Sequence, residues 1–192
     1  MNKYVTCKGV DFAMYLQNAM SQTIKKLKTN TANMITIGNL AFGGAAIMAT
    51  LNEYYSFSVL FIFIAGLLDR FDGMVARRFN LESELGKQLD SMSDIISFGI
   101  APALLMYSLV LQNFSVAGMA VTVIYIACGA FRLARFNITE SNGFFTGLPI
   151  TVAGVILTLS YFAIEFVPPV SYMFLFIILA FLMISTFTLR KV

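Results

Sequence analysis

The sequence contains no histidine and no tryptophan, and only two of its 192 residues are cysteine. The absence of histidine removes the most common general base and the most common ligand of transition metals. Cys7 and Cys128 are far apart in the sequence, and neither has the spacing of a metal-binding or redox motif, so we read both as packing residues in a reducing compartment. Any acid–base chemistry must therefore come from carboxylates, lysine or tyrosine.

Charged residues are also scarce. They make up 12 % of the chain, whereas 58 % is hydrophobic, and this balance excludes an ordinary soluble domain and indicates a membrane protein. A helix needs about 20 mostly apolar residues to cross a bilayer, and only helices or closed barrels satisfy the backbone there. The long apolar runs favour helices. We predict an all-α, polytopic membrane domain over residues 32–192, with six transmembrane helices at 32–51, 56–78, 86–111, 115–136, 145–164 and 170–189.

The distribution of basic residues predicts the orientation of these helices, because loops rich in lysine and arginine stay in the cytoplasm. If the N-terminus is inside, all 13 lysine and arginine residues fall at cytoplasmic ends of the helices. The only charged residues of the outer loops are then Glu53 and Glu165. We therefore expect a multi-pass protein of the cell (plasma) membrane with both termini in the cytoplasm.

Residues 1–31 form a separate N-terminal segment. Its apolar residues recur at helical spacing opposite polar and basic residues, which predicts an amphipathic helix lying on anionic lipid. The alternative is a solvated helix docked on the protein itself. The segment has no apolar core long enough for a signal peptide.

Acidic residues interrupt the cytoplasmic end of the second predicted span. Ionisable groups inside spans are costly and usually face a cavity, so they are candidate functional residues. Helical spacing puts five residues on one face, where they form one wall of a cavity: Asp69, Asp72, Gly73, Ala76 and Arg77.

A second polar row begins the third predicted span, where Gly86, Asp90 and Asp94 are spaced by four. The intervening loop lets the two rows face each other. Four converging carboxylates repel unless cations lie between them, and all-oxygen ligand sets suit two Mg²⁺ or Mn²⁺ ions. The small residues leave room for a bulky ligand, and Arg77 offers a planar donor that matches phosphate. The two rows predict a diphosphate site at the level of the lipid headgroups.

These eight residues match the signature D-x2-D-G-x2-A-R-x8-G-x3-D-x3-D at every fixed position, so the chain resembles the CDP-alcohol phosphotransferase family. The resemblance implies a six-helix enzyme, usually a homodimer, that displaces CMP from a CDP-linked lipid with an alcohol. It implies that Asp69, Asp72 and Asp90 bind the metals, and that Asp94 binds the second metal and deprotonates the alcohol. The residues that would contact CDP-diacylglycerol are Gly73, Ala76, Arg77 and Gly86.

Further stretches resemble the bacterial and archaeal branch of this family that uses L-serine as the acceptor. They are MITIGNLAFGG at 34–44, DSMSDIISFGIAPALL at 90–105, CGAFRLARFNI at 128–138 and GLPITVAG at 147–154. This branch would convert CDP-diacylglycerol and serine to phosphatidylserine and CMP. Family membership by itself leaves other acceptors open, among them glycerol 3-phosphate and an inositol phosphate.

Candidate acceptor-binding residues lie at the cytoplasmic end of the fourth span: Arg132, Arg135 and Asn137. An arginine pair can bind the carboxylate of serine or a phosphate, or it can simply anchor the helix end. On the first span, Thr36 and Asn39 lie one helical turn apart. They could bind the cytidine or the diphosphate, or instead form hydrogen bonds between helices.

A divalent-cation transporter is the main rival from another class. It predicts acidic residues near the middle of the bilayer, often with inverted repeats. Here the four aspartates cluster at cytoplasmic helix ends, Arg77 shares their face and no repeat is visible, so the enzyme is favoured. No nucleic-acid partner is predicted.

Overall fold

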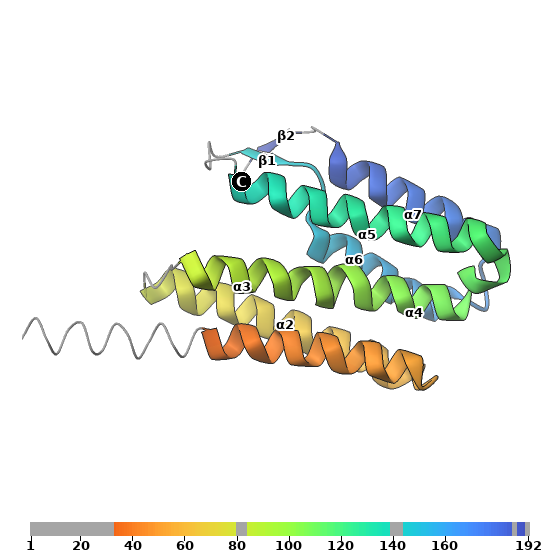
Figure 1. Cartoon of the computed structure of the whole chain (residues 1–192), viewed down its shortest axis with the longest axis horizontal. Helices are drawn as coiled ribbons and strands as arrows, with labels where there is room; N and C mark the ends of the chain where they lie inside the picture. The colour runs from red at the N-terminus through yellow and green to blue at the C-terminus, as the bar shows by residue number, and fades with distance from the viewer. Residues whose placement is uncertain (1–32, 80–83, 139–143, 186–187, 191–192) are drawn as a thin grey trace, which may run out of the picture.

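The computed structural model describes residues 33–79, 84–138, 144–185 and 188–190, and most of these residues are helical (Figure 1). The amphipathic helix predicted within 1–31 lies outside the described residues. Figure 1 shows long helices packed side by side along one axis. In chain order the helices are a first helix (Asn33–Leu51), α2 (Tyr55–Phe79), α3 (Glu84–Asp94), α4 (Ala101–Leu109), α5 (Ser115–Ile138), α6 (Ile150–Ser160) and α7 (Pro169–Ile184).

Three helical segments of the described residues are long and apolar enough to cross a membrane: Asn33–Leu51, Glu84–Leu109 and Leu111–Ile138. Ile150–Ala163 and Pro169–Ile184 are shorter apolar helices. The 25 residues of α2 have sufficient length, but charged residues occupy its second half. The chain thus has the helices of a membrane protein, whereas the count of six spans stays a prediction.

The fifth and sixth predicted spans are too long at one end each. Helix α6 begins at Ile150 and α7 ends at Ile184, because β1 (Phe144–Thr146) pairs antiparallel with β2 (Thr188–Arg190). Gly147 follows β1 with φ of +76°, and a Cβ on it would lie 2.6 Å from the Met183 carbonyl oxygen. Hydropathy did not reveal this ribbon, because apolar residues suit a strand as well as a helix. The all-α prediction is therefore correct for the bulk of the chain but missed the short ribbon.

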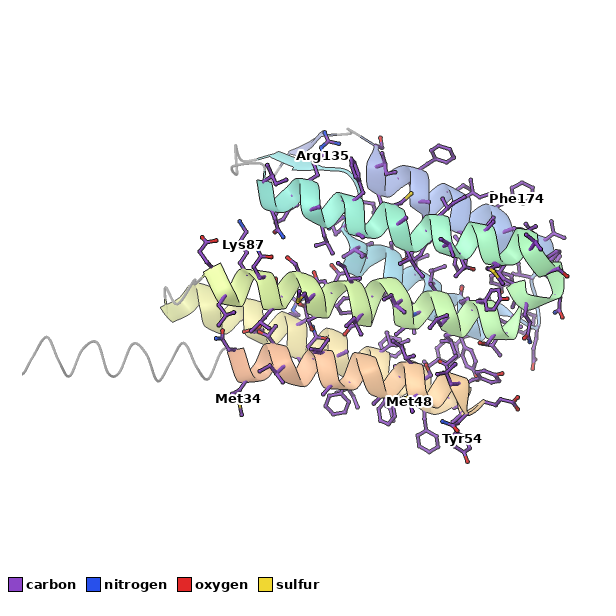
Figure 2. The ribbon with its side chains drawn as sticks, viewed as in Figure 1. Met34, Met48, Tyr54, Lys87, Arg135 and Phe174 are labelled. Atoms are coloured by element: carbon purple, nitrogen blue, oxygen red, sulfur yellow. The ribbon has the colours of Figure 1, made fainter. Side chains whose placement is uncertain are left out.

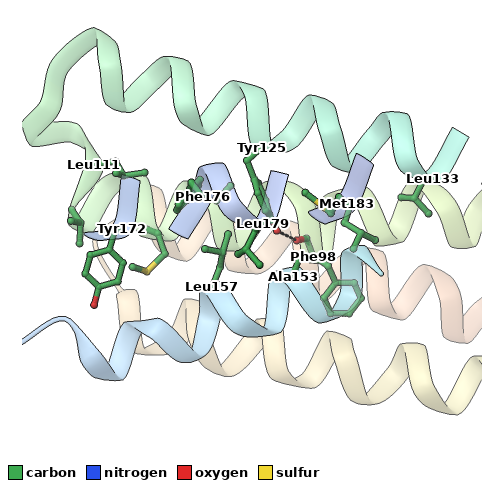
Figure 3. Close-up of a cluster of buried hydrophobic side chains, with 14 residues drawn as sticks. Phe98, Leu111, Tyr125, Leu133, Ala153, Leu157, Tyr172, Phe176, Leu179 and Met183 are labelled. Carbon is green, nitrogen blue, oxygen red and sulfur yellow. Dashed lines mark hydrogen bonds between the residues drawn. The ribbon is translucent and has the colours of Figure 1, made fainter. Parts of the chain in front are cut away.

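The larger apolar core lies between α4, α5, α6 and α7 (Figure 3). The rings of Tyr125 and Phe176 pack against each other at its centre, with centroids 5.3 Å apart and ring planes tilted by 60°. A smaller cluster, which includes Ala46, Ile62 and Leu105, joins the first helix to α2 and α4. The smaller cluster holds α2, which carries Asp69, and the larger one includes Phe98 of the helical segment that continues α3.

The helical winding changes directly after Asp94. Residues Ile95–Ile100 form a π-helical segment, and α4 follows with Pro102 in its first turn. Proline has no N–H to bond to the carbonyl four residues earlier, and the Tyr125 hydroxyl donates instead to that Phe98 carbonyl at 3.4 Å. Such π segments are often found at functional sites. Asp94 therefore lies at the junction between regular and π-helical backbone.

Candidate functional site

Three carboxylates from two helices converge at one end of the bundle. Asp69 comes from α2, and Asp90 and Asp94 come from successive turns of α3. Each offers one oxygen, and these three oxygens all lie within 4.8 Å of one another. The helical spacing seen in the sequence accounts for this geometry, because residues four apart lie on one helix face.

The geometry of this acidic cluster fits a divalent cation. Asp94 Oδ1 is buried and has no hydrogen-bond partner among the described residues. A buried carboxylate oxygen without a partner is costly, and a hard cation satisfies it. The donors are all oxygens, which are the ligands that Mg²⁺ and Mn²⁺ prefer.

Asp72 is the predicted metal ligand that does not belong to this group of three. It is buried, and the Thr36 hydroxyl of the first helix donates a hydrogen bond to its Oδ2. The structure therefore brings three of the four predicted ligands together and connects the fourth to a neighbouring helix.

Polar side chains join the first helix to α3 and to the π-helical segment that follows it, next to the cluster. Ser93 Oγ donates to the Thr36 carbonyl oxygen at 3.3 Å, and Ser97 Oγ donates to Asn39 Oδ1 at 2.8 Å. Thr36 and Asn39 were predicted either to bind the nucleotide or to join helices. Their side-chain oxygens have the second role here, whereas Asn39 Nδ2 is buried without a partner in the described part of the chain.

A cavity of about 600 Å³ opens onto the acidic cluster. Gly73 lines it, whereas Gly86 lies in the first turn of α3 and is not among the lining residues. Ala76 and Arg77 lie further along α2, and their side chains are outside the described part. The lining residues are Gly66, Asp69, Arg70, Gly73, Met74, Asp90, Asp94 and Thr151.

Sequence reasoning assigned no role to several of these lining residues. Arg70 carried a usable signal, because it is an ionisable residue inside a predicted span. Gly66 and Met74 carried none, because they are uncharged residues of a predicted span, whereas Thr151 lies in the stretch GLPITVAG quoted above.

A smaller, apolar cavity of about 260 Å³ adjoins the acidic one, and Gly66 and Thr151 line both. It runs between α2 and α6. Its remaining lining residues are Ile62, Phe63, Leu67, Phe98, Val155 and Thr158. A ligand with a charged head and an apolar tail would match this pair of cavities.

The predicted acceptor residues occupy the last two turns of α5. Arg132 is half-buried, its guanidinium lies 5.7 Å from the centre of the Phe136 ring, and it attracts Asp94. Its Nε is buried without a hydrogen-bond partner among the described residues. Asn137 Nδ2 donates to Ser91 Oγ on α3 at 2.8 Å, and Arg135 is half-buried. Arg132 and Asn137 thus face α3.

Comparison with known proteins gives a consistent set of relatives. The model of the CDP-alcohol phosphatidyltransferase family matches residues 29–189. The chain is 43 % identical over 127 residues to a CDP-diacylglycerol–serine O-phosphatidyltransferase of Bacillus subtilis, covering 66 % of this chain and 72 % of that protein. It is 36 % identical over 130 residues to a protein of the same name from Helicobacter pylori, covering 66 % of this chain and 55 % of that protein. An archaetidylserine synthase of Methanothermobacter thermautotrophicus is 35 % identical over 164 residues, covering 83 % of this chain and 69 % of that protein.

Proposed function

Because the chain belongs to the CDP-alcohol phosphatidyltransferase family, we propose that it transfers the phosphatidyl group of CDP-diacylglycerol to L-serine. The products are phosphatidylserine and CMP. The observation that carries this proposal is the convergence of Asp69, Asp90 and Asp94 on a cavity in a chain whose relatives have serine-specific names.

The acidic cluster would hold two divalent ions, Mg²⁺ or Mn²⁺. Asp69, Asp90 and Asp94 supply converging oxygens, and Asp72 supplies a carboxylate beside them. When bound, the metals would balance the charge of the diphosphate and of the departing CMP. Gly73 leaves space for the diphosphate against the α2 backbone, and we propose that Ala76, Arg77 and Gly86 continue this contact surface.

Asp94 is the proposed general base. The serine hydroxyl must lose its proton as its oxygen attacks phosphorus, and the chain has no histidine to accept it. Asp94 Oδ1 is buried without a partner in the described residues and borders the cavity, which supports this role.

The adjoining apolar cavity is the proposed site of an acyl chain of CDP-diacylglycerol. It shares Gly66 with the acidic cavity, so a lipid could place its diphosphate near Asp69 and its tail between α2 and α6. A tail bound there would remain at the membrane-facing surface while the headgroup reaches the carboxylates.

Arg132, with Arg135 and Asn137 near it, is proposed to receive the acceptor. The unpartnered Nε of Arg132 supports binding of the serine carboxylate, because arginine binds carboxylates through paired N–H groups. A phosphate would suit the same donors, so glycerol 3-phosphate and an inositol phosphate are the alternative acceptors. The serine-specific names of the relatives favour serine.

We propose that the active site faces the cytoplasm of a multi-pass plasma-membrane protein. In Figure 2, Lys87 and Arg135 lie at one end of the bundle and Tyr54 at the other. This arrangement supports an inward position for the acidic end, because basic residues favour the cytoplasmic side. The homodimer stays a prediction from the family resemblance.

An acceptor assay tests the proposal. Reconstituted protein would be given CDP-diacylglycerol, Mn²⁺ and one acceptor at a time, and CMP and lipid products would be measured. We expect CMP and phosphatidylserine with serine. CMP release only with glycerol 3-phosphate or an inositol phosphate would change the acceptor, whereas Mn²⁺ flux across vesicles without any CMP release would favour the transporter.

A further inference from the structure

Thr36 and Asp72 form a buried pair between the first helix and α2. Thr36 is 3 % exposed and Asp72 is 7 % exposed, and the Thr36 hydroxyl donates to Asp72 Oδ2. A hydroxyl has one proton to donate, and here the carboxylate receives it. The hydroxyl donor of Thr36 is therefore directed at a protein carboxylate, not at the cavity.

The backbone of Thr36 is also fixed, through its carbonyl oxygen, by the helix that carries the other carboxylates. Ser93 Oγ donates to this oxygen at 3.3 Å, and Ser93 is fully buried immediately before Asp94. A single residue of the first helix thus connects Asp72 on α2 with the Asp90–Asp94 turn of α3.

We propose that Thr36 is a positioning residue that orients the Asp72 carboxylate for divalent-cation binding. The hydrogen bond holds Oδ2 toward the first helix and restricts the side chain, so that the remaining oxygen is presented in one orientation. A donor that bonds to a metal ligand, and not to the metal itself, fixes the orientation of that ligand. Loss of such a donor typically weakens metal affinity about 10- to 100-fold. The inference rests on the proposed metal site, and it gives Thr36 a role different from the predicted contact with the nucleotide.

Mn²⁺ binding can be measured directly by titrating the protein in lipid nanodiscs with Mn²⁺ in the absence of nucleotide. The electron paramagnetic resonance signal gives the concentration of free Mn²⁺. Thr36→Val keeps the side-chain shape and removes the hydroxyl, and we expect about 10- to 100-fold weaker Mn²⁺ binding. Thr36→Ser keeps the hydroxyl and should restore affinity close to that of the unmodified protein. The matched control is Thr50→Val, which removes a buried hydroxyl of the same helix that bonds to Ser58 and the Ala46 carbonyl, remote from the acidic cluster.

A double-mutant cycle separates positioning from a general effect on packing. If Thr36 acts through Asp72, Thr36→Val should change Mn²⁺ affinity little when Asp72→Asn is already present. Ser93→Ala offers a second route that leaves the Thr36 hydroxyl in place and releases its carbonyl from α3. It should weaken Mn²⁺ binding in the same direction, which keeps the proposal testable even where Thr36→Val does not fold.

Three results would overturn the proposal. Unchanged Mn²⁺ affinity in Thr36→Val would remove the positioning role. Weaker binding of CDP-diacylglycerol with unchanged Mn²⁺ affinity would return Thr36 to the nucleotide. Absence of Mn²⁺ binding by the unmodified protein would contradict the metal site of the proposed function and, with it, the role of Thr36. The two failures are distinguishable, because in the first two cases the unmodified protein still binds Mn²⁺ and only the role of Thr36 fails.

Discussion

Asn137 Nδ2 donates a hydrogen bond to Ser91 Oγ over 2.8 Å, which ties the end of α5 to the turn of α3 between Asp90 and Asp94. Lys87 Nζ reinforces the tie by donating to the Asn137 carbonyl oxygen at 3.5 Å. The helix end that carries Arg132 is thereby held against the helix that carries the proposed base.

Asn137→Ala should loosen this tie and misplace the acceptor. A hydrogen bond of this kind contributes about 1 kcal/mol, so we expect the KM for serine to rise about 2- to 10-fold while that for CDP-diacylglycerol changes little. Steady-state kinetics with each substrate varied in turn would measure both. Asn52→Ala is the control, because Asn52, in the loop after the first helix, donates through Nδ2 to the nearby Met48 carbonyl oxygen. Equal effects of the two variants would contradict a specific role for Asn137.

Arg132→Ala should raise the KM for serine about 10- to 100-fold, since a hydrogen bond to a charged group contributes about 1.5–3 kcal/mol. Arg132→Lys separates binding from anchoring. Lysine keeps the positive charge at the helix end but lacks the planar paired donors, so we expect it to recover only part of the serine affinity. Full recovery with lysine would show that Arg132 mainly anchors α5.

Gly66→Leu should obstruct the passage between the acidic and apolar cavities. A Cβ at Gly66 would lie 3.5 Å from Phe98 Cε1, which is ordinary contact, so the larger leucine fills space without displacing backbone. We expect the KM for long-chain CDP-diacylglycerol to rise about tenfold, the equivalent of roughly two displaced CH₂ groups. A dihexanoyl substrate should be affected less. Gly44→Leu, at a position with open space around it, is the control, and identical KM changes for both chain lengths would argue against a tail site here.

Gly154→Ala should destabilise the protein at the π segment. Its added Cβ would lie 2.5 Å from the Phe98 carbonyl oxygen and 2.8 Å from Phe98 Cα, so backbone has to move. We expect a loss of about 1–3 kcal/mol in the free energy of unfolding, seen as a lower thermal midpoint in detergent. Gly44→Ala meets nothing within 4 Å and should be neutral or stabilising by up to about 1 kcal/mol. A midpoint for Gly154→Ala as high as that of Gly44→Ala would contradict the close packing.

The acidic cluster could be predicted from sequence for two reasons. Helical spacing puts Asp90 and Asp94 on one helix face, and the short loop before α3 lets that face lie opposite Asp69. The orientation of Asp72 could not be predicted. Its partner Thr36 lies on another helix, and which side chains meet between two helices depends on how those helices cross. Local periodicity does not contain that information.

The helix boundaries show the same division. The first four predicted spans agree with the observed helices to within two residues at each end. The fifth and sixth do not, because Phe144–Thr146 and Thr188–Arg190 form a ribbon whose pairing joins distant parts of the chain. The third predicted span also contains a π-helical segment at Ile95–Ile100, where the Tyr125 hydroxyl of α5 donates to the Phe98 carbonyl oxygen. Hydrophobic periodicity does not reveal such a contact between helices.

The most direct test of the account is the Asp94→Asn variant in reconstituted membranes supplied with CDP-diacylglycerol, serine and Mn²⁺. The substitution keeps the size of the side chain and removes its ability to accept the serine proton. We predict that CMP release falls about 100- to 10,000-fold, the usual contribution of a general base, while binding of CDP-diacylglycerol largely survives. Near-normal turnover by this variant would contradict the assignment of Asp94 as the base.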